Sequence, residues 1–488
     1  MRCLLPLLSV MTATGRGAKS VSHCRQQDSD GKRGILDVAI VGGGPNALRL
    51  LACLQTAHPT LRIATFEREE VGHTIAQWYD GSVSHSPRHT FQIGNLVPSE
   101  CTQCLDSLYT GVAAQTGGCN LDKGKRQHCG RDEYVAYMKR VVSTYQFNIC
   151  EHERVLSISV AGKEHGVDTT RTNEALTVLP SPKSGGDQTT LFELKTHRSH
   201  AHVGSVSSGS SRNHSYFAST VVLAFGGLSY PKPYGSVPVS TGARVVTKLG
   251  PAARYAGKHV VVMGSGPSGM ESAVRLCTEA YGAAHVTLAS RSSQLMFAWN
   301  VYLNESLWRI KHYVAAGRMT VQLDATLADV NATHADLKVA PKPPSCRRGS
   351  CLHGKPAQPV PPPRHVSVRA DEVIMAVGFQ SDVSLINSVG FPNGKITSDT
   401  CETSVPGIYN VGIQETAPWT SKTNKRQLST FIEDSYPMVR KVCKALQNRL
   451  HLTSPSSTAA AELALQSDGN GGADSTLPAY ERLAPAVD

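Results

Sequence analysis

The chain has 488 residues, of which 40% are hydrophobic, and a formal net charge of +11. A chain of this length is expected to form two or three domains, because a single hydrophobic core stops growing at a smaller size. The basic residues are scattered rather than gathered in a stripe with aromatic residues, so we expect anionic small molecules as ligands and no nucleic acid. No apolar run reaches the ~20 residues of a membrane-spanning helix, so no membrane span is expected.

The N-terminal segment 1–33 is predicted to be a leader or disordered. Arg2, Arg16 and Lys19 precede the first acidic residue, Asp28. This pattern suits an organellar transit peptide, although the short apolar run also allows a secretory signal and the polar remainder a cytosolic tail. The protein is accordingly expected to be cytoplasmic or mitochondrial.

Strand and helix patterns then alternate to about residue 142, as in an α/β unit. Three short strand patterns follow, "RVLSISV", "ALTVL" and "TTLFELKT", which predict an antiparallel β-meander. The low-complexity stretch 197–215 predicts a mobile loop.

A second α/β pattern begins near residue 258 and is interrupted by a Pro-rich basic insertion, 340–364, which is expected to be disordered. The strand pattern "ADEVIMAVGF" and a helix that ends near residue 450 complete the fold. The segment 451–488 is small and polar, as is typical of a tail.

A glycine-rich turn follows the first strand pattern, "LDVAIV", and has the spacing Gly42-x-Gly44-x-x-Ala47. Gly42 allows a tight turn, Gly44 lets a pyrophosphate approach the backbone, and Ala47 keeps the strand and the helix close. The next strand, "LRIATFE", ends in Glu67, whose carboxylate is placed to hold ribose hydroxyls. This turn therefore predicts a dinucleotide site.

A second turn of this kind, Gly264-x-Gly266-x-x-Gly269, follows the strand "HVVVM". Its next strand ends in Ser290-Arg291 instead of an acid. An acid would repel a 2′-phosphate, whereas Ser290 and Arg291 can bind a 2′-phosphate by donating charge-assisted hydrogen bonds to it. The second site is therefore predicted to bind NADPH.

Two such turns in this order resemble the two-dinucleotide-binding flavoprotein oxidoreductases. The segments 221–227 and 373–379 are similar to the crossovers that join the domains of that superfamily, and 403–412 resembles its late flavin-binding segment, with Gly412 at its end. Ile413 stands where the superfamily usually has Asp. The resemblance implies an α/β fold, with an FAD-binding Rossmann-like domain, an inserted smaller NADPH-binding Rossmann-like domain and the antiparallel β-meander.

The domain ranges follow from the same resemblance. The FAD-binding domain is expected to contain 34–256 and 371–450, and the NADPH-binding domain 257–370. The cofactors implied are FAD and NADPH, with no metal.

The N-hydroxylating branch of the class B flavoprotein monooxygenases resembles this chain at two further positions. Gln92, in "HTFQIGNLV", is implied to lie by the flavin, and Asn304, in "VYLNESLW", near the nicotinamide ribose and the substrate. The implied activity is a monooxygenase that uses O₂ to form a C4a-(hydro)peroxyflavin and oxygenates a small N- or S-nucleophile. The Lys with which this branch binds an amino-acid carboxylate is missing near Val97 and Pro98, so an ornithine- or lysine-type substrate is not indicated.

Two other functions remain open. Cys101 and Cys104 could form the thiol pair of an NAD(P)H-dependent disulfide reductase, and with Cys119, His128 and Cys129 they could instead bind zinc. A non-catalytic flavoprotein that acts as an interaction partner is the third possibility.

Overall fold

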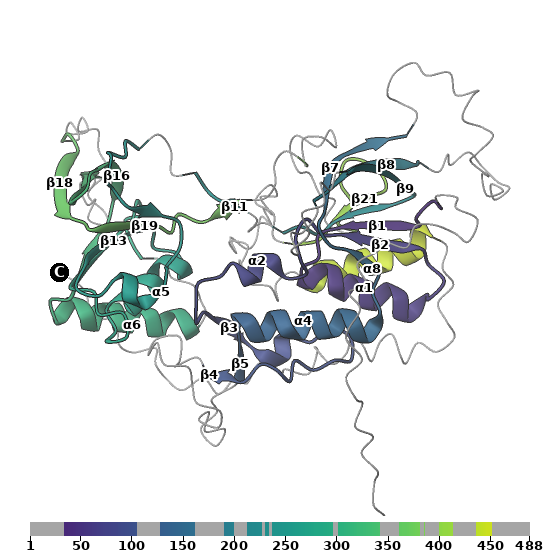
Figure 1. Ribbon diagram of the computed structural model, residues 1–488, viewed down its shortest axis with the longest axis horizontal. Helices are drawn as coiled ribbons and strands as arrows, with labels where there is room; N and C mark the ends of the chain where they lie inside the picture. The colour runs from purple at the N-terminus through teal and green to yellow at the C-terminus, as the bar shows by residue number, and fades with distance from the viewer. Residues whose placement is uncertain are drawn as a thin grey trace, which may run out of the picture.

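The computed structural model describes residues 34–104, 127–161, 190–199, 212–226, 230–233, 237–295, 301–341, 361–380, 385, 400–412 and 436–450. These residues form two lobes that lie side by side (Figure 1). A five-stranded sheet lies at the centre of each lobe. We call them the first sheet and the second sheet.

The first sheet is parallel, with the strand order β21-β10-β1-β2-β6. Its strands are β1 (Val38–Val41), β2 (Ile63–Phe66), β6 (Ile149–Cys150), β10 (Val221–Leu223) and β21 (Ile408–Asn410). Because the chain leaves β1 toward β2 and returns to β10 on the other side, the carboxyl end of β1 is a topological switch point, where open α/β sheets bind ligands.

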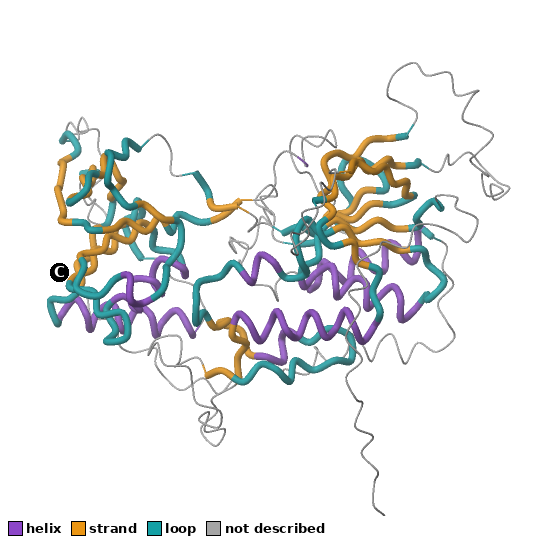
Figure 2. Tube along the Cα trace, viewed as in Figure 1, coloured by secondary structure: helices purple, strands orange, loops and turns teal. Residues whose placement is uncertain are grey.

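Helices cover one face of the first sheet, and an antiparallel sheet covers the other (Figures 1 and 2). The helices are α1 (Pro45–Ala57), α4 (Arg131–Tyr145) and α8 (Tyr436–Arg449). The antiparallel sheet consists of β7 (Glu153–Val160), β8 (Phe192–Arg198) and β9 (Arg212–Ala218).

The sequence of β1 explains this three-layer arrangement. Successive side chains of a strand point to opposite faces. Val38 and Ile40 belong to the core formed with the helices, whereas Ala39 and Val41 belong to the core formed with the antiparallel sheet. All four residues are buried, as expected for a parallel strand covered on both faces.

The second sheet repeats this plan with the strand order β12-β19-β13-β14-β15. Its strands are β12 (Val245–Val246), β13 (His259–Met263), β14 (His285–Ala289), β15 (Met319–Gln322) and β19 (Glu372–Met375). Helices α5 (Pro267–Leu276) and α6 (Val301–Ala315) belong to this lobe. Val260 and Val262 pack with α5, and Val261 and Met263 pack with a three-stranded antiparallel sheet. That sheet contains β16 (Ala325–Val330), β17 (His334–Val339) and β18 (Arg364–Arg369).

Two small sheets complete the described fold. One pairs β3 (Val83–Pro87), β5 (Gln127–Gly130) and β4 (Gln103–Cys104). The other pairs β11 (Tyr230–Pro231) with β20 (Phe379–Gln380) between the lobes. The remaining elements are the short helices α2 (His73–Ala76), η1 (Arg88–Phe91) and η3 (Ala252–Arg254).

The structure confirms the α/β class with two parallel sheets and an antiparallel sheet, and it corrects two loop predictions. The ends of 197–215 are strand, because β8 and β9 pair as far as Arg198 and Arg212. At the end of 340–364, Arg364 starts β18, where it pairs with Val339. The remainder of both segments largely lies outside the described residues, as do the leader, the tail and the predicted strand "ALTVL".

The second sheet also extends beyond 257–370, the range expected for the NADPH-binding domain. Both β12 and β19 lie outside that range and pair within this sheet, β19 directly with β13. The domain division otherwise stays a prediction.

Candidate functional site: two dinucleotide turns

The first turn, residues 42–47, connects β1 to α1, and its small residues have different roles. Gly42 has a φ of +109°, and a Cβ there would lie 2.7 Å from the Ala224 carbonyl oxygen of the adjacent chain. A Cβ on Gly44 would meet no protein atom within 4 Å. Ala47 is fully buried. The open space at Gly44, at the N-terminus of α1, is where a pyrophosphate can approach free N–H groups.

Glu67 follows β2 and turns back to the first turn. The Gly43 N–H donates to Glu67 Oε2 at 2.6 Å, and the Glu69 N–H donates to Oε1 at 3.0 Å. Burial raises the pKa of the Glu67 carboxyl, an effect that these two amide donors oppose. The carboxylate is thus fixed beside the turn, with lone pairs left to accept ribose hydroxyls.

Three strands of the first sheet end at glycines with positive φ around this turn. Gly226 follows β10 with a φ of +71°, and Gly412 follows β21 with a φ of +127°. A Cβ on Gly412 would lie 3.3 Å from Asn46 Nδ2 and 3.7 Å from Gly226 Cα. Only glycine fits this conformation without strain. These strand ends therefore present main chain in place of side chains beside the first turn. Gly226 belongs to the crossover segment 221–227, whose "AFGG" carries the signal in the sequence.

The second turn, residues 264–269, repeats the geometry between β13 and α5. Gly264 has a φ of +119°, and a Cβ there would overlap the Ala376 carbonyl oxygen. A Cβ on Gly266 would meet no protein atom within 4 Å, whereas one on Gly269 would overlap the Gly264 carbonyl oxygen. The space beside Gly266 at the N-terminus of α5 fits a second pyrophosphate.

The two residues after β14 occupy different environments. Ser290 is buried, and its Oγ lies 2.7 Å from Ser265 Oγ and accepts the Ser292 N–H at 3.1 Å. Arg291 is exposed and has no hydrogen bond or ion pair with any residue that the structure describes. The Ser290 hydroxyl thus organises the loop, and the Arg291 guanidinium is the cationic group available to a ligand.

Gln92 lies between η1 and a turn that α4 holds in place. Its Nε2 donates to the Gly94 carbonyl at 3.1 Å. Tyr137 of α4 accepts the Ile93 N–H and donates to the Leu96 carbonyl, each at 2.7 Å. Burial raises the pKa of Tyr137, which therefore stays protonated and keeps its donor role. Sequence reasoning missed Tyr137, because only the tertiary contact between α4 and this turn distinguishes it from any other helical tyrosine.

Asn304 lies in the first turn of α6, in the second lobe. Its side chain falls outside what the structure describes, and so do Ile413 and the side chain of Cys104. The proposed roles of Gln92 and Asn304 stay predictions.

The structure does not leave Cys101 free to form the alternative thiol pair with Cys104. Cys101 forms a disulfide with Cys129, because the pairing of β4 with β5 brings the two residues together. Both are fully buried, and this bond uses two of the residues considered as zinc ligands. His128 instead places Nδ1 3.0 Å from the Ser84 carbonyl oxygen. A second disulfide, Cys53–Cys443, joins α1 to α8.

The thiols that remain free in the described part of the chain are Cys277 and Cys401, both buried. Burial raises the pKa of Cys277 to about 12 and also raises that of Cys401. A thiol with a raised pKa is a poor nucleophile near neutral pH.

These features define a flavin-dependent pyridine nucleotide oxidoreductase: two parallel sheets, each with a dinucleotide turn at the switch point. The chain belongs to the pyridine nucleotide-disulphide oxidoreductase family, whose model matches residues 36–413. FAD and NAD(P)H are the cofactors of this class.

Solved structures of several activities are similar in fold. The bacillithiol disulfide reductase Bdr of Bacillus cereus is 17% identical, with a TM-score of 0.58 over 85% of this chain and 100% of its own. The ornithine N-hydroxylase of Kutzneria sp. 744 is 11% identical, with a TM-score of 0.52 over 86% and 100%. A flavin-containing monooxygenase of Stenotrophomonas maltophilia is 14% identical, with a TM-score of 0.51 over 85% and 99%. At these identities the likeness concerns the fold.

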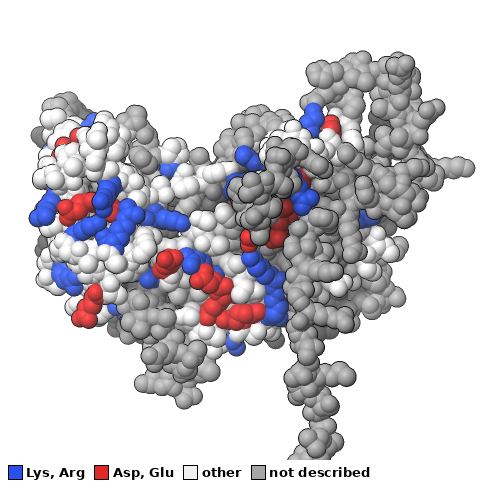
Figure 3. Space-filling view, in the orientation of Figure 1, with Lys and Arg blue, Asp and Glu red and all other residues white. Residues whose placement is uncertain are grey.

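Among the described helices, none combines the length and the apolar character that crossing a membrane would require. Lys and Arg side chains gather on the lobe of the second sheet around a short acidic stretch, on the face that Figure 3 shows.

Proposed function

We propose that the protein is an FAD- and NADPH-dependent monooxygenase that uses O₂ to oxygenate a small N- or S-nucleophile. The observation that carries the proposal is the pair of dinucleotide turns, one for each cofactor. The free thiols among the described residues, Cys277 and Cys401, are buried, and burial raises the pKa of each. Such thiols are poor nucleophiles, so in this proposal the flavin delivers its electrons directly to a small acceptor, of which O₂ is the simplest.

FAD fits the first turn. Gly44 leaves room for its pyrophosphate, and Glu67, already held by the Gly43 N–H, can accept its ribose hydroxyls. The strand ends at Gly226 and Gly412 lie beside this turn. When bound there, FAD would accept a hydride from NADPH and pass electrons on to O₂.

NADPH fits the second turn. Gly266 leaves the matching space at the N-terminus of α5. Arg291 is cationic, exposed and without a partner among the described residues, which suits a 2′-phosphate. No carboxylate stands at the end of β14, so the selectivity expected is for NADPH over NADH.

Gln92 is proposed to orient the substrate side of the flavin. The amide N–H that bonds Gly94 fixes its direction, and Tyr137 holds the turn that follows. A fixed amide close to the reacting atoms can exclude water and hold a substrate hydrogen bond without reorganising. In the same proposal Asn304 lies near the nicotinamide ribose.

The test uses the FAD-loaded protein, NADPH and ¹⁸O₂ with a panel of primary amines, hydroxylamines, thiols and thioethers. The proposal predicts NADPH-dependent oxygen uptake, with H₂O₂ release in the absence of substrate and one ¹⁸O atom in the product when a substrate fits. Anaerobic turnover of a low-molecular-weight disulfide, with no ¹⁸O in any product, would show a reductase instead. Replacing Cys101 and Cys129 together by Ser is expected to lower stability but to leave the chemistry unchanged.

A further inference from the structure

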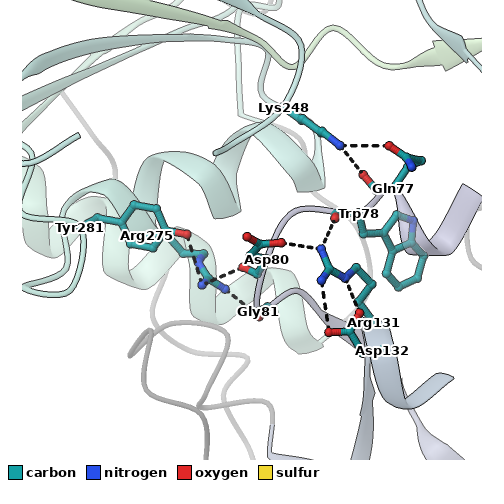
Figure 4. A network of polar contacts seen from close by, with 9 residues as sticks. All are labelled: Gln77, Trp78, Asp80, Gly81, Arg131, Asp132, Lys248, Arg275 and Tyr281. Carbon is teal, nitrogen blue, oxygen red and sulfur yellow. Dashed lines mark hydrogen bonds and ion pairs between the residues drawn. The ribbon is translucent and has the colours of Figure 1, made fainter. Parts of the chain in front are cut away.

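The segment 77–82, here called the bridge segment, connects α2 to β3 and contacts both lobes (Figure 4). Its side chains enter both hydrophobic cores. Trp78 packs against the helix-side core of the first lobe. Tyr79 packs against the core around α5, which also contains Val83 at the start of β3. The bridge segment is therefore part of both lobes, unlike an exposed linker.

Arg275 of α5 binds the main chain of the bridge segment. Its Nη1 donates to the Gly81 carbonyl at 2.8 Å, and its Nη2 to the Asp80 carbonyl at 3.3 Å. The guanidinium carbon lies 5.2 Å from the centre of the Tyr79 ring and 5.3 Å from that of Tyr281. The residue is 3% exposed, and no described carboxylate lies within ion-pair distance of it.

Arg275 also donates through Nη2 to the Tyr281 hydroxyl at 3.4 Å (Figure 4). It is thus a buried arginine held by carbonyls, a hydroxyl and aromatic rings, an arrangement that is a weak source of stability. Removing its charge from water is unfavourable before any contact is made. The carbonyl dipoles and the faces of the aromatic rings offset part of this desolvation free energy. Arg275 fits Gly81 closely as well, because a Cβ at that glycine would lie 3.0 Å from Arg275 Nη2.

A second contact attaches the same face of α5 to the bridge segment. Tyr79 Oη donates to Glu271 Oε2 at 2.6 Å, and Glu271 lies one turn before Arg275 on α5. Residues four apart share one face of a helix. Lys248 adds a contact from the chain before β13, since its Nζ donates to the Gln77 carbonyl at 3.2 Å.

The bridge segment is fixed to the first lobe by Arg131, the first residue of α4. Its Nη1 pairs with Asp80 Oδ1 at 2.6 Å and donates to the Trp78 carbonyl at 3.0 Å. Its N–H donates to the Ser82 carbonyl at 3.1 Å. The same helix α4 carries Tyr137, which holds the turn after Gln92.

Helix α5 thus has a cofactor end and an anchored end. Gly266 is its N-cap, and Arg275 lies nine residues further along, or about 13 Å at 1.5 Å per residue. Without the anchor, a tilt of a few degrees would move the N-terminus by roughly 1 Å. Hydride transfer needs reacting atoms about 3–3.5 Å apart, and a misplacement of this size can cost about 100-fold in rate.

We infer that Arg275 is a positioning residue for hydride transfer: by holding the bridge segment it sets the distance between the dinucleotide at the second turn and the one at the first. This inference rests on the proposed binding of NADPH and FAD. Arg275 contacts neither turn itself, so its effect is expected on the transfer step and not on nucleotide binding.

The test compares Arg275→Ala and Arg275→Lys with the control Arg318→Ala by anaerobic stopped-flow reduction of the FAD-loaded protein. Arg318 is a half-buried arginine of the same lobe whose Nη2 donates to the Ala283 carbonyl at 3.2 Å. Arg275→Ala is expected to lower the limiting reduction rate by about 10- to 100-fold while the NADPH Kd changes less than about threefold. Arg275→Lys should restore part of the rate, because Lys can reach one carbonyl. An unchanged limiting rate, or an equal loss in Arg318→Ala, would overturn the inference.

Amide hydrogen exchange gives a readout that does not depend on activity. Arg275→Ala should increase exchange across the bridge segment and β3, whereas Arg318→Ala should not. Tyr79→Phe removes the hydroxyl that donates to Glu271 and is a milder variant should Arg275→Ala fold poorly; it should show the same two effects at smaller size. If wild-type protein is not reduced by NADPH, the proposed function fails. If the protein is reduced but exchange in the bridge segment is unaffected by Arg275→Ala, the anchor fails.

Discussion

Replacing Arg291 by Ala tests which nucleotide the second turn selects. Arg291 is exposed, and no described residue competes for its guanidinium. A hydrogen bond to a charged group contributes about 1.5–3 kcal/mol, and exposure to solvent and salt favours the lower half of that range. A loss of about 1.5–2 kcal/mol corresponds to a roughly 10- to 30-fold weaker NADPH complex. NADH has no 2′-phosphate for Arg291 to bind, so the Kd of the NADH complex should change less than about twofold.

The assay measures both Kd values from the concentration dependence of anaerobic flavin reduction, at low and high salt. Arg364→Ala is the matched control, since it removes one exposed cation from the same lobe, on β18. The difference between the two nucleotides should shrink as salt is added. An equal loss for NADH and NADPH, or an equal loss in the control, would refute the assignment of the 2′-phosphate to Arg291.

Three further predictions follow from the geometry. Gly269→Ala should destabilise the cofactor-free protein by about 1–3 kcal/mol in denaturant unfolding, because its Cβ would overlap the Gly264 carbonyl oxygen. Cys53→Ala should lower the free energy of unfolding by about 2–4 kcal/mol, because it removes the cross-link to Cys443. Glu67→Gln should lower the FAD content of the purified protein, measured as the flavin-to-protein absorbance ratio. The same variant should also lose one pH dependence of the free energy of unfolding. Burial raises the pKa of the Glu67 carboxyl in the folded protein, so with rising pH the unfolded chain ionises first. The contribution of Glu67 to stability therefore falls as the pH rises above 4.5.

Each of these predictions has a contrasting variant. A Cβ at Gly266 meets no protein atom, so Gly266→Ala should leave stability unchanged and weaken NADPH instead; equal destabilisation by both glycine variants would contradict the account of the turn. Cys277→Ser, at a buried free thiol, leaves the Cys53–Cys443 disulfide in place, so reducing agent should lower the stability of this variant more than that of Cys53→Ala. Unchanged flavin content in Glu67→Gln would argue against its contact with ribose.

The parts of the fold that depend on local sequence could be predicted. A buried strand, a turn with small residues at fixed spacing and a following helix give the same structure wherever they occur, so both turns and both sheets were expected. Gly269 and Ala47 show the limit of this reasoning. They hold the same position in the two motifs, and only the structure shows that a Cβ at Gly269 would overlap the Gly264 carbonyl oxygen, whereas Ala47 is accommodated in the core.

The parts that depend on distant contacts could not be predicted. Cys101 is three residues from Cys104, yet it bonds Cys129 because strand pairing decides which thiols meet. Arg275 looks like an ordinary helical arginine, and the carbonyls that it binds are 194 and 195 residues away in the chain. No local pattern specifies such a contact.

Anaerobic titration of the FAD-loaded protein with NADPH tests the central claim, that one chain holds two dinucleotides and passes electrons between them. The account predicts stoichiometric binding of FAD and loss of the oxidised flavin absorbance with one equivalent of NADPH, followed by reoxidation when O₂ is admitted. A protein that binds no flavin on reconstitution, or whose flavin stays oxidised in excess NADPH, would contradict it.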